Sequence, residues 1–252
     1  MEVGYYLSKS EVNELLANFQ EKEKFHNLIR EMKKHEEFDF NTETVEVIQG
    51  LKFDTLKEKE LISAKVLALK INEKINIRYI TRHLNGDLDT KNEFFVGDIT
   101  TANTESDTMI KHLVFRAHQD DQVSTLEKEY PEEAVALSKE LDEEFDKEFN
   151  YDEGYYPGQL LDQVDSEAVI KGCIAGGYLY CGAACGGHPA CAGSKKGING
   201  LDNCCKTHDC CYHAKNTSGP NCYCDQNLCD CAQAAPWKKA TPLVEAAFCF
   251  VC

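Results

Sequence analysis

The segment LDNCCKTHDCCYH, residues 201–213, places a His-Asp pair between two Cys-Cys pairs. Three kinds of site use such crowding: a zinc site, a structural disulfide knot, and a catalytic histidine on a cross-linked helix. Zinc ligands are typically separated by roughly two to four residues, and adjacent cysteines on a helix chelate poorly. The spacing therefore disfavours zinc and leaves the disulfide knot and the catalytic histidine.

The cysteine spacing predicts two helices joined side by side. Cys204 and Cys211 are two helical turns apart and share a face, and the same holds for Cys224 and Cys231. In an antiparallel helix pair, facing residues have a constant sum of residue numbers. The pairs 204/231 and 211/224 have the same sum, so the pattern predicts the disulfides Cys204–Cys231 and Cys211–Cys224.

The same spacing predicts the surroundings of His208. This residue lies between Cys204 and Cys211 on one helix face, so it points toward the partner helix. Asp225 lies close to the position opposite, where a carboxylate fixes the tautomer of an imidazole and raises its basicity. Asp209 points about 100° away around the helix, toward the Gly-rich segment 175–197. We expect an oriented histidine with a second carboxylate beside it.

Three motifs in this region resemble one enzyme family. CCKTHDCCY matches the Cys-Cys-x-x-His-Asp-x-Cys signature of the secreted phospholipases A2. YLYCGAACGG resembles the calcium loop of that family, and CYCDQNLCDC resembles the second-helix segment of its venom branch. The resemblance covers about 173–235. It implies a small, disulfide-rich α-helical domain that hydrolyses the sn-2 ester of glycerophospholipids with Ca²⁺ as cofactor.

The resemblance also implies a role for individual residues. His208 would be the general base that takes a proton from water, Asp225 its partner, and Tyr212 a hydrogen-bond donor to Asp225. No serine or cysteine nucleophile is needed. Calcium would polarise the ester carbonyl and would be held by the Asp209 carboxylate and by the backbone carbonyls of Tyr180, Gly182 and Ala184. Further implied disulfides are Cys181–Cys205 and a bond from Cys222 to Cys249 or Cys252.

Composition divides the chain into regions. All 14 cysteines lie between Cys173 and Cys252, and residues 171–252 carry 7 Lys and 5 acidic residues. The remainder carries 20 Lys and Arg against 38 Asp and Glu, which gives −18 there and −16 overall. Clustered positive charge, which nucleic-acid binding needs, is missing. We expect an acidic α+β domain with an antiparallel sheet at 1–120, an acidic helix and linker at 121–170, and a Cys-rich domain at 171–252.

Hydrophobic spacing supports this division. Residues 8–35 show the period of one amphipathic helix that starts with a Ser8/Glu11 capping box. Residues 44–118 show strand-like runs separated by turn signals. The acidic stretch 121–153 keeps a helical apolar stripe, and 201–215 and 221–234 suit two further helices. His83, His112 and His118 are scattered, and we interpret them as ordinary core or surface residues.

Cysteine density predicts an oxidising, extracellular compartment. The start, MEVGYYLSKSEVNELL, lacks the basic and apolar regions of a signal peptide, so we expect secretion by a route without one. No apolar stretch is long enough to span a membrane.

The C-terminal tail suggests contact with a membrane surface, and the N-terminal region suggests a segment that controls the enzyme. The tail PWKKATPLVEAAFCFVC has aromatic and basic residues that suit a phospholipid membrane surface, but the favoured interpretation is that they pack the small core. The N-terminal region would mask the enzyme or act as an immunity segment, with cleavage between about 150 and 172. The alternative is a non-catalytic stapled toxin, antimicrobial or binding module, or a zinc-binding Cys/His module. A structural knot needs neither Asp209 nor Asp225, so this pair favours the enzyme.

Overall fold

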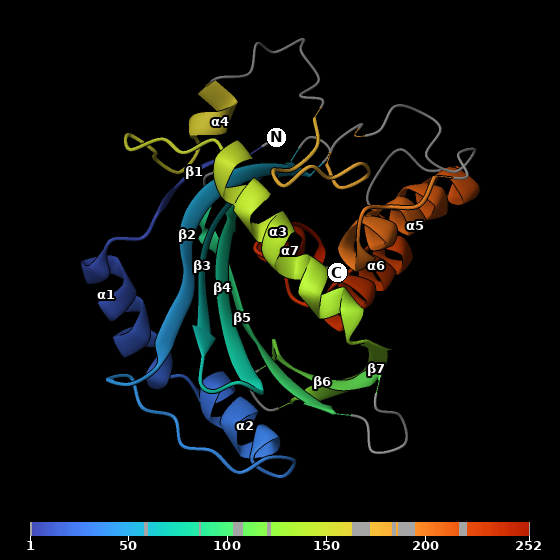
Figure 1. Ribbon diagram of the computed structural model, residues 1–252. Helices are drawn as coiled ribbons and strands as arrows, with labels where there is room; N and C mark the ends of the chain where they lie inside the picture. The colour runs from blue at the N-terminus through green and yellow to red at the C-terminus, as the bar shows by residue number, and fades with distance from the viewer. Residues whose placement is uncertain are drawn as a thin grey trace.

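The computed structural model of the protein (Figure 1) describes residues 2–57, 60–85, 87–102, 108–119, 122–162, 172–182, 185, 195–216 and 221–251. Seven strands form one antiparallel sheet, and each strand pairs with its neighbours in the chain. Their bounds are β1 Glu2–Tyr6, β2 Glu46–Lys57, β3 Glu60–Lys70, β4 Ile75–Leu84, β5 Asp87–Ala102, β6 Met109–Ala117 and β7 Ser124–Pro131. An α+β N-terminal part with an antiparallel sheet is therefore confirmed.

Seven helices complete the described chain. They are α1 Lys9–Gln20, α2 Glu23–Met32, α3 Glu133–Glu148, α4 Gln159–Asp162, α5 Gly200–Lys215, α6 Cys222–Ala234 and α7 Thr241–Phe248. The C-terminal region is helical and cross-linked, as expected from the cysteine spacing.

The prediction of one helix over 8–35 is wrong in its middle. The capping box of Ser8 and Glu11 is present, but α1 ends at Gln20 and α2 begins at Glu23 because Lys22 has extended backbone angles. The break lets Phe19 and Phe25 pack against each other, with ring centroids 4.8 Å apart, while both stay buried. Packing of two short helices on the sheet thus outweighs the local helical period.

The prediction of one acidic helix over 121–153 is also only half right. Its first part forms the edge strand β7, and α3 follows. Most residues of β7 are exposed and three of its side chains are glutamate or lysine in succession, a composition that protects a sheet edge from further pairing. Charge of this kind fits an edge strand as well as a solvated helix, which explains the error.

Helices cover both faces of the sheet (Figure 1). One buried cluster combines α1 and α2 with sheet residues such as Ile77 and Phe95. A second cluster joins the opposite face, with residues such as Phe53 and Ile80, to α3, α5, α6 and α7. Along β4, side chains alternate between the two clusters, as the period of a strand requires. The Cys-rich region therefore shares one core with the N-terminal sheet.

The disulfides follow the predicted antiparallel register. Cys204–Cys231 and Cys211–Cys224 join α5 to α6 with Cα–Cα distances of 5.6 and 5.7 Å. Cys181–Cys205 ties the preceding loop to α5. Cys173–Cys185 and Cys229–Cys249 are further bonds. Such a set is typical of extracellular proteins.

One implied disulfide alternative is wrong. Cys249 pairs with Cys229 on the buried face of α6, so it cannot bond Cys222. Cys222 is disulfide-bonded, and Cys252, the other implied partner, lies outside the described residues. No described cysteine is a free thiol, which removes the thiolate ligands that the zinc alternative would need from this part of the chain.

Candidate functional site

The centre of the candidate site is a histidine–aspartate pair across α5 and α6. His208 Nε2 lies 2.9 Å from Asp225 Oδ1, and the Tyr212 hydroxyl donates to the same oxygen at 2.8 Å. The Tyr212 oxygen in turn accepts the backbone N–H of Asn221, the N-cap of α6. Asp225 stands near the start of α6, where the helix dipole favours a negative charge. The disulfide register thus brings together the three residues predicted from spacing and resemblance.

A fourth group comes from the N-terminal sheet and was not predicted. Lys57, the last residue of β2, donates to Asp225 Oδ2 at 2.6 Å. The side chains of Lys57 and Asp225 are only 3% and 1% exposed, so this is a buried ion pair. Lys57 has the same strand parity as Leu51 and Phe53, which face the C-terminal helices. That parity was the available signal, but the partner lies 168 residues away in the chain.

Aromatic rings surround His208. The ring of Tyr212 lies 4.7 Å from it, and that of Phe248, at the end of α7, meets it edge-on at 4.8 Å. Lys57 Nζ lies 5.2 Å from the centroid of the Phe248 ring. The His208 side chain is consequently only 10% exposed.

Burial and charge act in opposite directions on both partners. Burial lowers the pKa of His208, but its contacts with Asp209 and Asp225 outweigh burial and leave the pKa raised. Burial raises the pKa of Asp225, yet hydrogen bonds from His208, Lys57 and Tyr212, together with the charge of Lys57, leave it lowered. Asp225 therefore stays a carboxylate, and a carboxylate on Nε2 increases the proton affinity of Nδ1.

Asp209 stands on the other side of the imidazole. Its Oδ1 lies 3.9 Å from His208 Nδ1, and its side chain is 31% exposed. It accepts no hydrogen bond from another described residue. A partly exposed carboxylate whose partner among the described residues is this imidazole supplies the kind of oxygen ligand that Ca²⁺ prefers.

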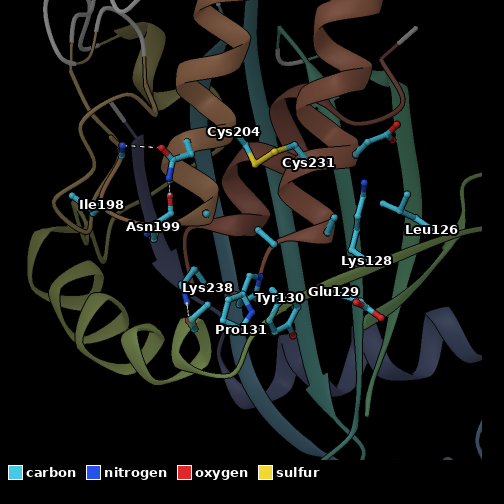
Figure 2. A pocket seen from close by; sticks show the side chains of 18 of the residues that line it. Leu126, Lys128, Glu129, Tyr130, Pro131, Ile198, Asn199, Cys204, Cys231 and Lys238 are labelled. Atoms are coloured by element: carbon cyan, nitrogen blue, oxygen red, sulfur yellow. Dashed lines mark hydrogen bonds between the residues drawn. A yellow bond between two sulfur atoms is a disulfide. The ribbon is translucent and has the colours of Figure 1, made fainter. Parts of the chain in front are cut away.

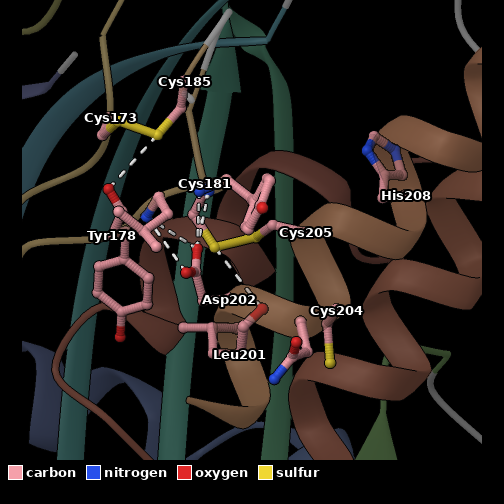
Figure 3. The surroundings of a disulfide bond; sticks show 12 residues. Cys173, Tyr178, Cys181, Cys185, Leu201, Asp202, Cys204, Cys205 and His208 are labelled. Atoms are coloured by element: carbon pink, nitrogen blue, oxygen red, sulfur yellow. Dashed lines mark hydrogen bonds between the residues drawn. A yellow bond between two sulfur atoms is a disulfide. The ribbon is translucent and has the colours of Figure 1, made fainter. Parts of the chain in front are cut away.

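A buried carboxylate organises the loop that precedes α5 (Figure 3). Asp202 is fully buried and accepts the backbone N–H groups of Leu179, Tyr180, Cys181 and Ile198. The disulfide Cys181–Cys205 fastens the same loop to α5. Sequence reasoning missed Asp202; its place at the third position after the N-cap Asn199 was the available signal.

The described part of this loop can present backbone oxygens. The carbonyl of Tyr180 accepts no hydrogen bond from a described residue, whereas that of Gly182 accepts the Cys185 N–H at 3.2 Å. Gly182 has a φ of +124°, and a Cβ there would lie 2.3 Å from the Gly172 oxygen, so only glycine fits. Ala184, the remaining predicted ligand, lies outside the described residues. Asp209 and Tyr180 therefore keep oxygens that other described residues do not occupy, but the described part of the chain contains no cluster of three or more His, Cys, Asp or Glu side chains that could hold a metal ion.

A cavity of about 710 Å³ lies elsewhere, between β7, the start of α5 and the end of α6 (Figure 2). The Cys204–Cys231 disulfide and the apolar parts of Leu126, Tyr130 and Ile198 line it. His208, Asp209 and Asp225 do not. The cavity belongs to the junction between the sheet and the C-terminal helices, and it is separate from the candidate site.

The tail residues expected at a lipid surface are covered here. Lys238 is 2% exposed and its Nζ lies 3.5 Å from the Ala134 carbonyl of α3. Lys239 pairs with Asp146 of α3. Phe250 stacks on His118, with ring centroids 4.2 Å apart. In this arrangement the core-packing interpretation of the tail describes Lys238 and Phe250 better than an exposed edge.

Comparisons with known proteins add no relative. No protein-family model, no curated protein and no solved structure matches the chain. Among the described residues, no helix is both long and apolar enough to cross a membrane.

Proposed function

We propose that residues 171–252 form a calcium-dependent hydrolase of the phospholipase A2 type, which cleaves the sn-2 ester of glycerophospholipids. The observation that carries this proposal is the His208–Asp225–Tyr212 arrangement, in which Nε2 is held and Nδ1 is left beside Asp209. A structural knot needs no such oriented imidazole. The three sequence motifs that resemble the secreted phospholipases A2 support the same conclusion.

The chemistry follows from the proton positions. Asp225 accepts the proton on Nε2, so the lone pair of the neutral ring lies on Nδ1 and takes a proton from a water molecule. That water attacks the ester carbon, and the imidazolium then returns its proton to the leaving alkoxide. Calcium, held by Asp209 and by carbonyls of the loop around Tyr180 and Gly182, would stabilise the negative charge on the ester oxygen.

We further propose that the N-terminal region masks this enzyme, with an immunity role as one form of masking. The support comes from α3, an acidic helix that lies against the tail of the Cys-rich region. Asp146 pairs with Lys239, and Asp142 accepts the Lys239 backbone N–H. Lys238 is buried beneath the same helix. They are two of the seven lysines in 171–252 that an anionic phospholipid surface would attract, and Lys195 and Lys196 remain exposed.

His208→Gln tests the catalytic proposal. His213, also on α5 but exposed, provides the matched control His213→Gln. Both variants are oxidised and cut between residues 150 and 172, and the pieces are left together because the two halves share a core. We expect His208→Gln to lose calcium-dependent vesicle hydrolysis and His213→Gln to keep it. Full activity of His208→Gln would contradict the mechanism.

The alternative of a non-catalytic stapled module gives a different result in the same assay. Such a module would bind or permeabilise vesicles without releasing fatty acid, and His208→Gln would not change that. Masking is tested by comparing the uncut chain with the cut one, and we expect hydrolysis of anionic vesicles to rise on cutting. Equal activity before and after, with gel filtration showing that the N-terminal piece has separated from the cut chain, would exclude masking.

A further inference from the structure

Lys57 joins the N-terminal sheet directly to the candidate site. It is the only lysine or arginine of the described residues with a hydrogen bond to Asp225, and both groups are almost fully buried. Removal of one partner of a buried ion pair lowers the free energy of unfolding, because the charge that remains has lost its counter-charge. The sheet is thus bound to the carboxylate on which His208 depends.

The same face of the sheet also binds α7, whose Phe248 ring packs against His208. Arg82 of β4 donates to the carbonyls of Ala246 and Phe250, which flank Phe248. Arg78, four residues earlier on the same face of β4, donates to Glu245 of α7. These bonds hold the end of α7, where the Phe248 ring contacts both His208 and the Lys57 ammonium.

We propose that Lys57 is a latch through which the N-terminal sheet holds the candidate site closed, by pairing with Asp225 and backing the Phe248 ring against His208. This inference rests on the proposed function, because it names how masking reaches that site. Masking then has two parts. Helix α3 covers Lys238 and Lys239 of the tail, and Lys57 holds Asp225 inside the site. Release of the sheet withdraws the ammonium from Asp225 and removes the support of Phe248.

The test uses the uncut, oxidised full-length chain. Lys57→Met removes the charge and the hydrogen bond, and Lys57→Gln keeps a donor but removes the charge. Arg116→Gln is the matched control, because Arg116 of β6 pairs with Asp230 of α6 at 2.6 Å, in the same junction but away from His208. Hydrogen exchange of the amides in 241–249 reports release of α7, and fatty-acid release from anionic vesicles reports opening of the site.

In both Lys57 variants we expect exchange in 241–249 to become about 100-fold faster, as loss of one partner of a buried pair implies. Vesicle hydrolysis by the uncut chain should rise about tenfold or more in the same variants. Arg116→Gln should leave both values near wild type.

Two results would overturn the latch. The first is exchange in 241–249 that is unchanged in both Lys57 variants, or that is equally fast in Arg116→Gln. The second is hydrolysis that falls in the Lys57 variants while the cut wild-type chain is active, since Lys57 would then support the reaction. Failure of the proposed function is distinguishable, because the cut wild-type chain would release no fatty acid whatever the exchange data show.

Discussion

Lys238 is a buried cation whose replacement should stabilise the protein. It lies beneath α3 with 2% exposure, and burial lowers the pKa of its ammonium from 10.5 to about 8, although Asp142 opposes the change. One pKa unit corresponds to about 1.4 kcal/mol, so a charged Lys238 at pH 7 costs the fold about 3 kcal/mol. Loss of the polar contacts of Lys238, which include the hydrogen bond to the Ala134 carbonyl, offsets about 1 kcal/mol or more of that. We therefore expect Lys238→Met to raise the free energy of unfolding by up to about 2 kcal/mol at pH 7.

The stabilisation by Lys238→Met should decrease as pH rises. Between pH 8 and 10.5 the unfolded chain binds a proton on Lys238 that the folded chain has lost. Wild-type stability from this group therefore increases as pH rises through that window, and it is lost as pH falls through 8. The advantage of Lys238→Met over wild type should shrink as pH rises above 8, vanish by about pH 10 and reverse slightly at about pH 10.5.

Urea unfolding of the oxidised proteins at several pH values between 7 and 10.5 measures this difference. Lys239→Met is the control, because Lys239 is partly exposed and pairs with Asp146 at the surface, where an ion pair contributes about 0 to 1 kcal/mol. A destabilised Lys238→Met whose difference from wild type stays constant up to pH 10.5 would refute the reasoning. It would mean that the ammonium is well solvated in the fold.

Three further predictions concern buried carboxylates. Asp202→Asn should lower the free energy of unfolding by about 2 kcal/mol and raise the calcium concentration needed for half-maximal activity, because loop amides lose a charged acceptor; unchanged values in denaturation and calcium titration would contradict this. Asp54→Asn should speed proteolysis within 155–160 several-fold, since Asp54 accepts hydrogen bonds from Tyr155, Gly158 and Leu160. An unchanged cleavage rate would argue against that anchoring. The pKa of Asp225 is lowered, so its contribution to stability should be present above the ordinary aspartate value and disappear as pH falls through the folded value; acid unfolding of Asp225→Asn should lack this component.

Residues that repeat at a short interval were the ones that sequence reasoning placed well. The spacing of Cys204, Cys211, Cys224 and Cys231 depends only on helical geometry, so it fixed the register of α5 and α6 and brought His208 opposite Asp225. Helix–helix geometry of this kind is local. It can be predicted without knowledge of the rest of the chain.

Long-range contacts could not be placed in the same way. Lys57 lies in a stretch of mixed charge, and nothing near it in the sequence indicates that β2 ends beside α6. The break at Lys22 is likewise decided by the sheet, because each of the two short helices buries a phenylalanine against it. His112, interpreted as an ordinary residue, is buried beside Asp98 at 2.9 Å. These features arise from tertiary packing, which local period does not encode.

The sheet with two covered faces has a consequence for synthesis. The helices on one face, α1 and α2, precede most of the strands in the chain, but α5, α6 and α7 on the other face are made last. At about 5–20 residues per second, the 121 residues that follow β7 take roughly 6–24 s to be made. Phe53, Ile80 and Phe94 have no C-terminal cover during that time. The N-terminal half therefore completes its core only when the Cys-rich half packs against the sheet, so the two halves finish folding together.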